Sequence, residues 1–220
     1  RANIGQQSLK LVLTPVPPLP EQRAIAAALS DVDALLDGLD RLIAKKRDLK
    51  QAAMQQLLTG QTRLPGFSGE WETKLLGDMC NLKSGEGITS AMIDDCSPYP
   101  CYGGNGLRGF TTTFTHCGEY TLIGRQGALC GNVVRVGGKF YASEHALVVT
   151  PKPNIDIDWL TVALRRMDLN QYSESSAQPG LSAAKLLLIN IDLPSTKSEQ
   201  TAIAAILSDM DAEIAALEAR

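Results

Sequence analysis

The chain has 220 residues, of which 44% are hydrophobic, and a formal net charge of −3 at pH 7. This length gives room for one domain plus extensions, and the apolar content is typical of a folded protein with a core. No apolar run approaches the roughly 18 residues of a membrane span, and the acidic net charge argues at first against nucleic-acid binding.

The cysteines indicate a reducing compartment. There are five, an odd number, and no two are spaced as Cys-x-x-Cys, so neither a disulfide framework nor a zinc site is indicated. We expect reduced thiols in a cytoplasmic protein. The chain starts at Arg1 with neither an initiator methionine nor a signal-peptide profile, so we expect it to be a piece of a longer protein.

One stretch of sequence occurs twice. Residues 21–34 and 199–212 are identical at 11 of 14 positions, with a constant offset of 178 residues. A repeat of this length predicts one structural unit used twice, with a module carried between the two copies.

The repeated unit has the spacing of a coiled coil. Apolar residues advance by alternating steps of four and three in both copies, which is the a/d pattern of a heptad. They are Ile25, Leu29, Val32, Leu36, Leu39 and Ile43 in the first copy, and Ile203, Leu207, Met210, Ile214 and Leu217 in the second. The first helix is predicted from Glu21 to about Leu58, roughly 57 Å long, which suits a strut. Two ordinary amphipathic helices packed on a domain are the alternative.

Similar segments precede both helices. Residues 8–13 are predicted as a strand and are followed by a proline-rich run, which cannot continue the strand. Residues 185–193 are predicted as a strand ending at Pro194, and residues 196–199 have the form of a capping box. Residues 1–20 are therefore interpreted as the tail of an upstream recognition domain.

The region between the helices predicts a mixed α+β domain. Residues 59–69 are rich in turn formers, and short β-rich runs follow at 120–123, 132–136 and 146–149. Ile157 to about Tyr172 predicts one amphipathic helix, capped by Asp156 or Asp158.

Two glycine-bounded loops carry side chains suited to reading DNA. Residues 104–109 fit G-x-G-x-x-G, but a β-like run follows instead of the helix of a dinucleotide site, so we expect a loop presenting Asn105 and Arg108. In the second loop Arg125 and Gln126 follow a strand; arginine can pair with guanine and glutamine with adenine. A structural hydrogen-bond network around Arg125 is the alternative.

Charge supports this interpretation of the middle of the chain. Residues 100–153 hold five basic residues against two acidic ones, a net charge of +3. Glu144 and His145 hint at hydrolytic chemistry, but no nucleophile motif accompanies them, so we expect a buried hydrogen-bonding pair and no catalytic residues.

Together these motifs resemble the specificity subunit of Type I restriction–modification enzymes. The resemblance is carried by residues 17–22 before the first helix, residues 64–71 before the domain, and three segments inside it: 102–110, 122–127 and 143–146. It implies target-recognition domains that each read half of a split DNA sequence, spaced by two helices packed antiparallel.

The resemblance also implies partners. Modification methyltransferase subunits dock on the subunit and restriction subunits join the complex; S-adenosylmethionine, ATP and Mg belong to those partners, and no cofactor or metal is expected in this chain. We expect double-stranded DNA to contact Lys83, Asn105, Arg108, Arg125, Gln126 and Lys139.

The sequence thus predicts an α+β fold: one globular mixed target-recognition domain flanked by two long helices that pack as an antiparallel coiled coil. The predicted boundaries are 1–20 for the upstream tail, 21–60 for the spacer helix, 61–195 for the recognition domain and 196–220 for a truncated second helix. A homodimer through the helices is possible. The alternatives are a coiled-coil interaction protein carrying a β-rich ligand-binding domain, and an enzyme acting through Glu144 and His145.

Overall fold

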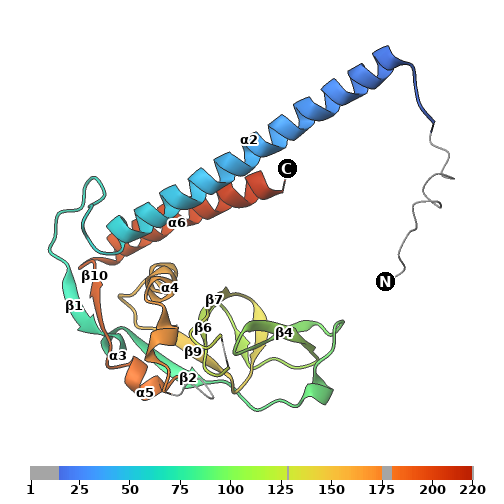
Figure 1. The fold of residues 1–220 in the computed structure, drawn as a ribbon. Helices are drawn as coiled ribbons and strands as arrows, with labels where there is room; N and C mark the ends of the chain where they lie inside the picture. The colour runs from blue at the N-terminus through green and yellow to red at the C-terminus, as the bar shows by residue number, and fades with distance from the viewer. Residues whose placement is uncertain (1–14, 128, 175–179, 220) are drawn as a thin grey trace. The chain divides into compact units, whose positions relative to one another are not determined.

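The computed structural model describes residues 15–127, 129–174 and 180–219 (Figure 1). The strand expected at residues 8–13 lies outside the described residues. The chain divides into two compact units: Leu49–Glu213, which holds the globular domain, and the remaining parts of the two long helices. Among the described residues, no helix is long and apolar enough to cross a membrane.

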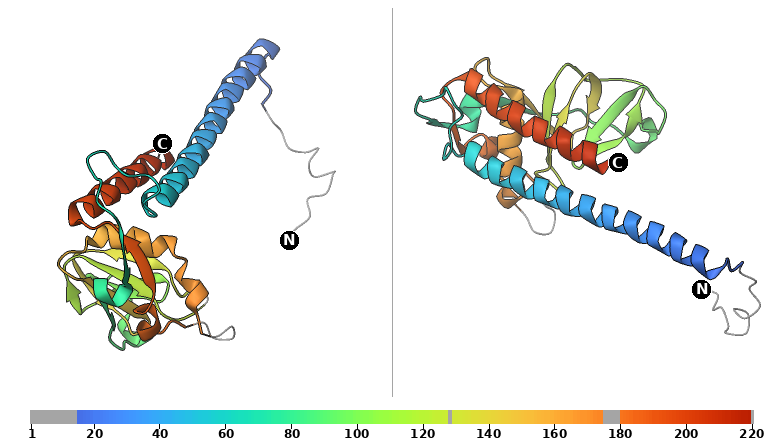
Figure 2. Two further views of the ribbon diagram at one scale, coloured as in Figure 1. Left: turned by 90° about the vertical axis from the view of Figure 1, so that its left-hand side faces the viewer. Right: turned by 90° about the horizontal axis from the view of Figure 1, so that it is seen from above.

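The two copies of the repeat form helices. Helix α2 spans Leu19–Leu57 and helix α6 spans Lys197–Glu218. Lys50 pairs with Asp211, and Arg47 with Glu218 at 2.6 Å, so positions rising along α2 meet positions falling along α6. The predicted antiparallel pairing is confirmed, and Figure 2 shows the two helices side by side.

The domain contains two four-stranded sheets and a two-stranded one. The first four-stranded sheet has the order β2-β9-β6-β7, and the second has the order β4-β3-β8-β5. Strands β1 and β10 pair antiparallel and join the entry of the domain to its exit. The strand bounds are β1 Glu72–Leu75, β2 Cys80–Ser84, β3 Tyr99–Gly103, β4 Gly106–Thr111, β5 His116–Cys117, β6 Tyr120–Gly124, β7 Val133–Val136, β8 Lys139–Ala142, β9 Ala146–Pro151 and β10 Asn190–Leu193.

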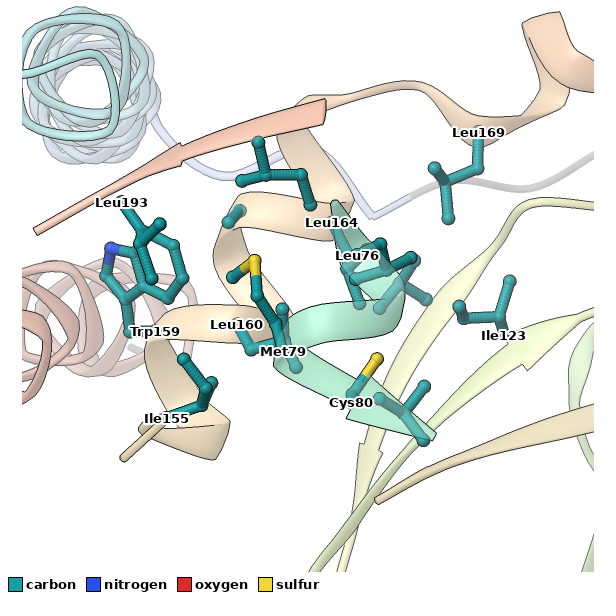
Figure 3. Close-up of a cluster of buried hydrophobic side chains, with 14 of the residues drawn as sticks. Leu76, Met79, Cys80, Ile123, Ile155, Trp159, Leu160, Leu164, Leu169 and Leu193 are labelled. Carbon is teal, nitrogen blue, oxygen red and sulfur yellow. The ribbon is translucent and has the colours of Figure 1, made fainter. Parts of the chain in front are cut away.

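Alternation along the strands builds two layers of core. Ile123 and Leu147 face the main core with helix α4, Ile157–Arg166. Their neighbours Leu122 and Val148 face Phe140 of the second sheet, because successive side chains of a strand point to opposite faces. Figure 3 shows Trp159, Leu160 and Leu164 of α4 beside Leu76, Met79 and Ile123. The first sheet is thus covered by α4 on one face and by the second sheet on the other.

Three expectations about local structure need correction. The helix beginning at Ile157 ends at Arg166, because Asp168 adopts a left-handed φ of 47°, and a separate 3-10 turn covers Leu169–Tyr172. Asp156 is its N-cap, accepting hydrogen bonds from the backbone N–H groups of Asp158 and Trp159. The strand expected from residue 185 begins only at Asn190, since Ala183–Leu186 form the short helix α5, which buries Leu186.

The capping box at α6 is only half formed. Thr196 Oγ1 accepts the N–H of Glu199 at 3.3 Å, as expected. The Glu199 carboxylate does not return to the cap; it binds Arg63 instead. The other short helical segments are α3, Leu76–Met79, and the 3-10 turn Ser90–Met92.

Candidate nucleic-acid interface

Close backbone contacts bring three loops together. They are the β3–β4 turn, the loop after β6 and the β8–β9 turn, which hold the motifs singled out in the sequence. A Cβ on Gly124 would lie 1.9 Å from the carbonyl oxygen of Gly104, and a Cβ on Gly104 would lie 2.6 Å from that of Gln126. These approaches require glycine, which explains the glycine-rich sequence of both loops.

Arg125 is the residue most firmly tied to this cluster. Its backbone N–H donates to the carbonyl of His145 at 2.8 Å, and its carbonyl accepts the N–H of Leu181 at 2.8 Å. Its Nη1 donates to Ser84 Oγ at 2.8 Å, and the residue is half-buried. The structural network that the sequence left open is present. A guanidinium has five N–H donors, so this bond still leaves donors for a ligand.

Arg108 lies beside Arg125's loop on strand β4. It is exposed, and a Cβ on Gly103 would lie 2.9 Å from its Cδ and 3.4 Å from Ser143 Oγ. The stem of Arg108 therefore crosses Gly103 beside the β8–β9 turn. Because the neighbouring backbone fixes the stem, its guanidinium is presented from a preorganised position.

Asn105 and Gln126 complete the exposed polar set. Asn105 sits in the β3–β4 turn, and Gln126 forms an antiparallel bridge with Gly180. Both residues are exposed. Asn105 also borders a hollow of about 530 Å³ whose other lining residues include Asn132 and Arg165. Four of the six residues predicted to bind DNA are thus brought to one loop cluster, defined here as Asn105, Arg108, Arg125 and Gln126.

The two predicted lysines lie elsewhere in the domain. Lys83 is exposed on β2, opposite Val148 of β9. Lys139 begins strand β8, whose other end leads into the turn at Ser143, and its Nζ lies 4.9 Å from the ring centroid of Phe114. Phe114 in turn meets Tyr99 edge-on at 5.0 Å. The structure therefore groups Lys139 with aromatic side chains and not with the loop cluster.

Two basic residues of the central window have structural roles. Arg135 pairs with Glu119 at 2.9 Å and with Asp158 at 2.6 Å, and Lys152 donates to the carbonyl of Gly77 at 2.9 Å. The net charge of residues 100–153 therefore overstates the positive charge available to a ligand. Arg108, Arg125 and Lys139 remain as the basic side chains of that window that could meet phosphate or base.

Glu144 and His145 are half-exposed, contrary to the expectation of a buried pair. Their side chains approach to 3.2 Å, each 41% exposed, and Glu144 also accepts the N–H of Ile88 at 3.3 Å. Among the described residues, Ser143 Oγ and His145 Nδ1 are buried without a hydrogen-bond partner. No group of three metal-ligating side chains occurs in the described part of the chain.

Burial shifts several pKa values around the sheets. Burial lowers the pKa of His116, with Glu86 opposing the shift and Lys83 adding to it. Burial raises the pKa of the Cys80 thiol to about 12, although Lys152 opposes it. The Ser97 hydroxyl and nearby backbone N–H groups lower the pKa of Asp94. None of these groups belongs to the loop cluster.

Sequence reasoning missed the parts that support the loop cluster from a distance. Ser84 from β2 and the Gly180–Leu181 segment hold Arg125 and its loop, and they lie 41 residues before Arg125 and 55 residues after Gln126 along the chain. Neither has a local pattern that announces this role. By contrast, the aromatic pair around Lys139 lies within a predicted β-like run.

Known proteins were compared with this chain. Residues 68–220 match the family model described as the Type I restriction modification DNA specificity domain. The EcoprrI specificity subunit of Escherichia coli is 47% identical over 146 residues, and a putative type I restriction enzyme specificity subunit of Haemophilus influenzae is 31% identical over 153 residues. These matches cover 64% and 68% of this chain but only 36% and 39% of the relatives, so the chain spans well under half of their length.

Solved structures share the fold. A Type I restriction-modification S subunit from M. genitalium is similar with a TM-score of 0.71, at 20% identity, over 91% of this chain and 56% of that one. The HsdS subunit from Thermoanaerobacter tengcongensis is similar with a TM-score of 0.60, at 20% identity, over 99% of this chain and 57% of that one. With the family model matching more than two thirds of its residues, the chain belongs to the Type I restriction modification DNA specificity domain family.

Proposed function

We propose that this chain is a DNA-sequence-specificity module whose loop cluster reads one half of a bipartite target in double-stranded DNA. The observation that carries the proposal is the convergence of Asn105, Arg108, Arg125 and Gln126 on three loops that glycine contacts hold together. A reader of bases needs such donors on a rigid scaffold, because a misplaced donor loses its bond to the base edge.

The side chains match the chemistry of the major groove. Arginine donates two bonds to O6 and N7 of guanine, and asparagine or glutamine pairs with N6 and N7 of adenine. Each such contact contributes about 1–3 kcal/mol of discrimination against the wrong base. Lys139 and Lys83 lie outside the cluster and are assigned to phosphate, which fixes register without reading sequence.

The helices are assigned to spacing and assembly. Helix α2 has 39 residues, about 58 Å at 1.5 Å per residue. We assign to the paired helices the spacing of recognition domains and the docking of modification methyltransferase subunits, with restriction subunits joining the complex. The module itself is assigned no catalysis; S-adenosylmethionine, ATP and Mg belong to the partner subunits, and the complex acts in the cytoplasm.

The alternative is an interaction protein that works through its helices. The observation that favours it is the exposure of the heptad residues near the start of α2, with Leu29 61% and Leu36 54% exposed. In that case the β-rich domain would bind another ligand. A homodimer through the helices is a related possibility, which sedimentation velocity of the isolated chain tests.

The test of the proposal is DNA selection. The chain is reconstituted with its methyltransferase subunit and mixed with a library of duplexes carrying randomised positions, and bound duplexes are recovered by gel shift. We expect enrichment of a defined half-site. Recovery of duplexes without any sequence preference, from a complex that has assembled, would leave the interaction-protein alternative.

A further inference from the structure

The start of helix α6 is held by a buried polar contact. Glu199, 2% exposed, accepts Arg63 Nε at Oε1 and Arg63 Nη2 at Oε2, both at 2.7 Å. Gln200, 1% exposed, accepts the N–H of Asp156 at 2.8 Å. Arg63 comes from the linker that follows α2, so the first residues of α6 are fastened to the segment where α2 ends.

Apolar residues extend this contact along the helix. Ile203 and Leu207, one and two turns further along α6, lie in the same buried cluster as Leu57 and Leu58 at the end of α2. Residues 50–63 thus act as a receptor segment for the start of α6: a helix end with two leucines, followed by an arginine.

The same side chains recur, uncovered, at the start of α2. Glu21 and Gln22 correspond to Glu199 and Gln200, and both are exposed. Ile25 and Leu29 correspond to Ile203 and Leu207, yet they are 47% and 61% exposed instead of 1% and 0%. The local geometry is also repeated: Gln22 Nε2 donates to the carbonyl of Pro17 at 2.7 Å, as Gln200 Nε2 donates to that of Pro194 at 3.3 Å.

Charge follows the same logic. Residues 41–63 hold six basic residues and one acidic residue, a net charge of +5, whereas residues 199–218 hold five acidic residues and no basic one. Arg47 with Glu218 and Lys50 with Asp211 show this match as ion pairs. Residues 21–40 hold five carboxylates and one arginine, a net charge of −4. The uncovered half of α2 therefore has the charge of α6 and calls for the same kind of partner.

We infer that Glu21, Gln22, Ile25 and Leu29 form a docking surface for a second receptor segment: a basic helix end with leucines, followed within about five residues by an arginine that binds Glu21. The chain's own receptor segment is already filled by α6, which is tethered beside it at a high effective concentration. A second copy of the acidic half is disfavoured because two segments of like charge would face each other. The partner is thus a segment like residues 41–69, supplied by another polypeptide.

This inference concerns the helices alone and stands whether or not the loop cluster binds DNA. It is tested on the full 220-residue chain with a fluorescently labelled peptide of residues 41–69 as the probe. Fluorescence anisotropy should show saturable binding. Glu21→Arg should weaken binding at least about tenfold, the effect of a like charge placed at a paired site. A peptide carrying Arg63→Glu should bind the unaltered chain equally weakly.

A charge swap separates a direct contact from a general effect. The Glu21→Arg chain and the Arg63→Glu peptide should bind each other again, at close to the original affinity. Leu29→Ala should also weaken binding, whereas Leu35→Ala, a 73% exposed leucine outside the heptad seam, serves as the matched control and should not.

Three results would overturn the inference. One is absence of peptide binding by a chain whose circular dichroism shows that it is folded. Another is binding that Glu21→Arg and Leu29→Ala leave unchanged, since the peptide would then pair with α6. The third is a concentration-dependent dimer of the chain that Leu29→Ala abolishes, since the occupant would then be a second copy.

Discussion

Arg63 and Glu199 form a bidentate ion pair across 136 residues of sequence, with both N···O distances at 2.7 Å. The pair closes the domain, because Arg63 lies in the linker that enters it and Glu199 begins the helix that leaves it. Glu199 is 2% exposed, so its carboxylate depends on this partner for the hydrogen bonds that water would otherwise supply.

Removal of the arginine should therefore destabilise the chain. Loss of one partner from a buried ion pair leaves an uncompensated charge, which costs about 3–5 kcal/mol; we expect Arg63→Ala to lower the free energy of unfolding by about 3 kcal/mol, because the Arg63 side chain is 25% exposed. Urea denaturation measures this. Lys74→Ala, which breaks the exposed pair with Glu72, is the control and should cost less than about 1 kcal/mol. Equal effects of the two variants would show that the Arg63 pair is energetically a surface pair.

The repeat offers a matched pair of leucines for a test of burial. Leu207 is fully buried and Leu29 is 61% exposed, although both sit in the same sequence context. Leu207→Ala should cost about 2–5 kcal/mol of unfolding free energy through lost burial and a cavity. Leu29→Ala in the isolated chain should stay within about 0.5 kcal/mol, as for most surface changes. A large cost for Leu29→Ala would mean that the chain already covers this face in solution.

The histidine between the sheets should make stability depend on pH. Burial lowers the pKa of His116 in the folded chain below its usual 6.5, so the folded state binds fewer protons than the unfolded state in this window. Its contribution to stability is present above pH 6.5 and is lost as the pH falls through the lowered folded pKa. Urea titrations at pH 7.5 and 5.5 should show a smaller loss on acidification for His116→Phe, which keeps the stacking on Phe140, than for the unaltered chain. The same loss in both proteins would exclude His116 as the cause.

The cysteines should divide by burial. Cys96 and Cys117 are exposed, whereas Cys80, Cys101 and Cys130 are buried, and burial raises the pKa of Cys80 to about 12. A thiol reagent such as Ellman's reagent at pH 8 should label two thiols quickly and the other three only after denaturation, because the thiolate is the reactive form. Rapid labelling of Cys80 in the native chain would contradict its position in the core.

The helical frame was readable from the sequence because it depends on periodic, local signals. The 178-residue repeat and the spacing of Ile25, Leu29 and Val32 predicted two helices that pair. The glycine-bounded turn around Asn105 and the loop at Arg125 were predicted separately. Their meeting was not, since it depends on Gly104 and Gly124 approaching each other in three dimensions.

The errors came from tertiary contacts that override local propensity. The run of leucines near residue 186 has strand character, but residues 183–186 form a helical turn that buries Leu186. Glu199 follows the pattern of a capping box, yet the distant Arg63 binds its carboxylate. Sequence spacing cannot reveal a partner 136 residues away.

The central claim is that the loop cluster reads DNA bases, and altered sequence preference tests it most directly. Selection from the randomised duplex library is repeated with Arg108→Ala, with Arg125→Ala, and with Arg166→Ala as a control, since Arg166 is exposed on α4 outside the cluster. Each cluster variant should relax preference at one position of the half-site and lose about 1–3 kcal/mol of discrimination there, while Arg166→Ala keeps the full preference. Cluster variants that assemble and bind yet select an unchanged half-site would contradict the claim.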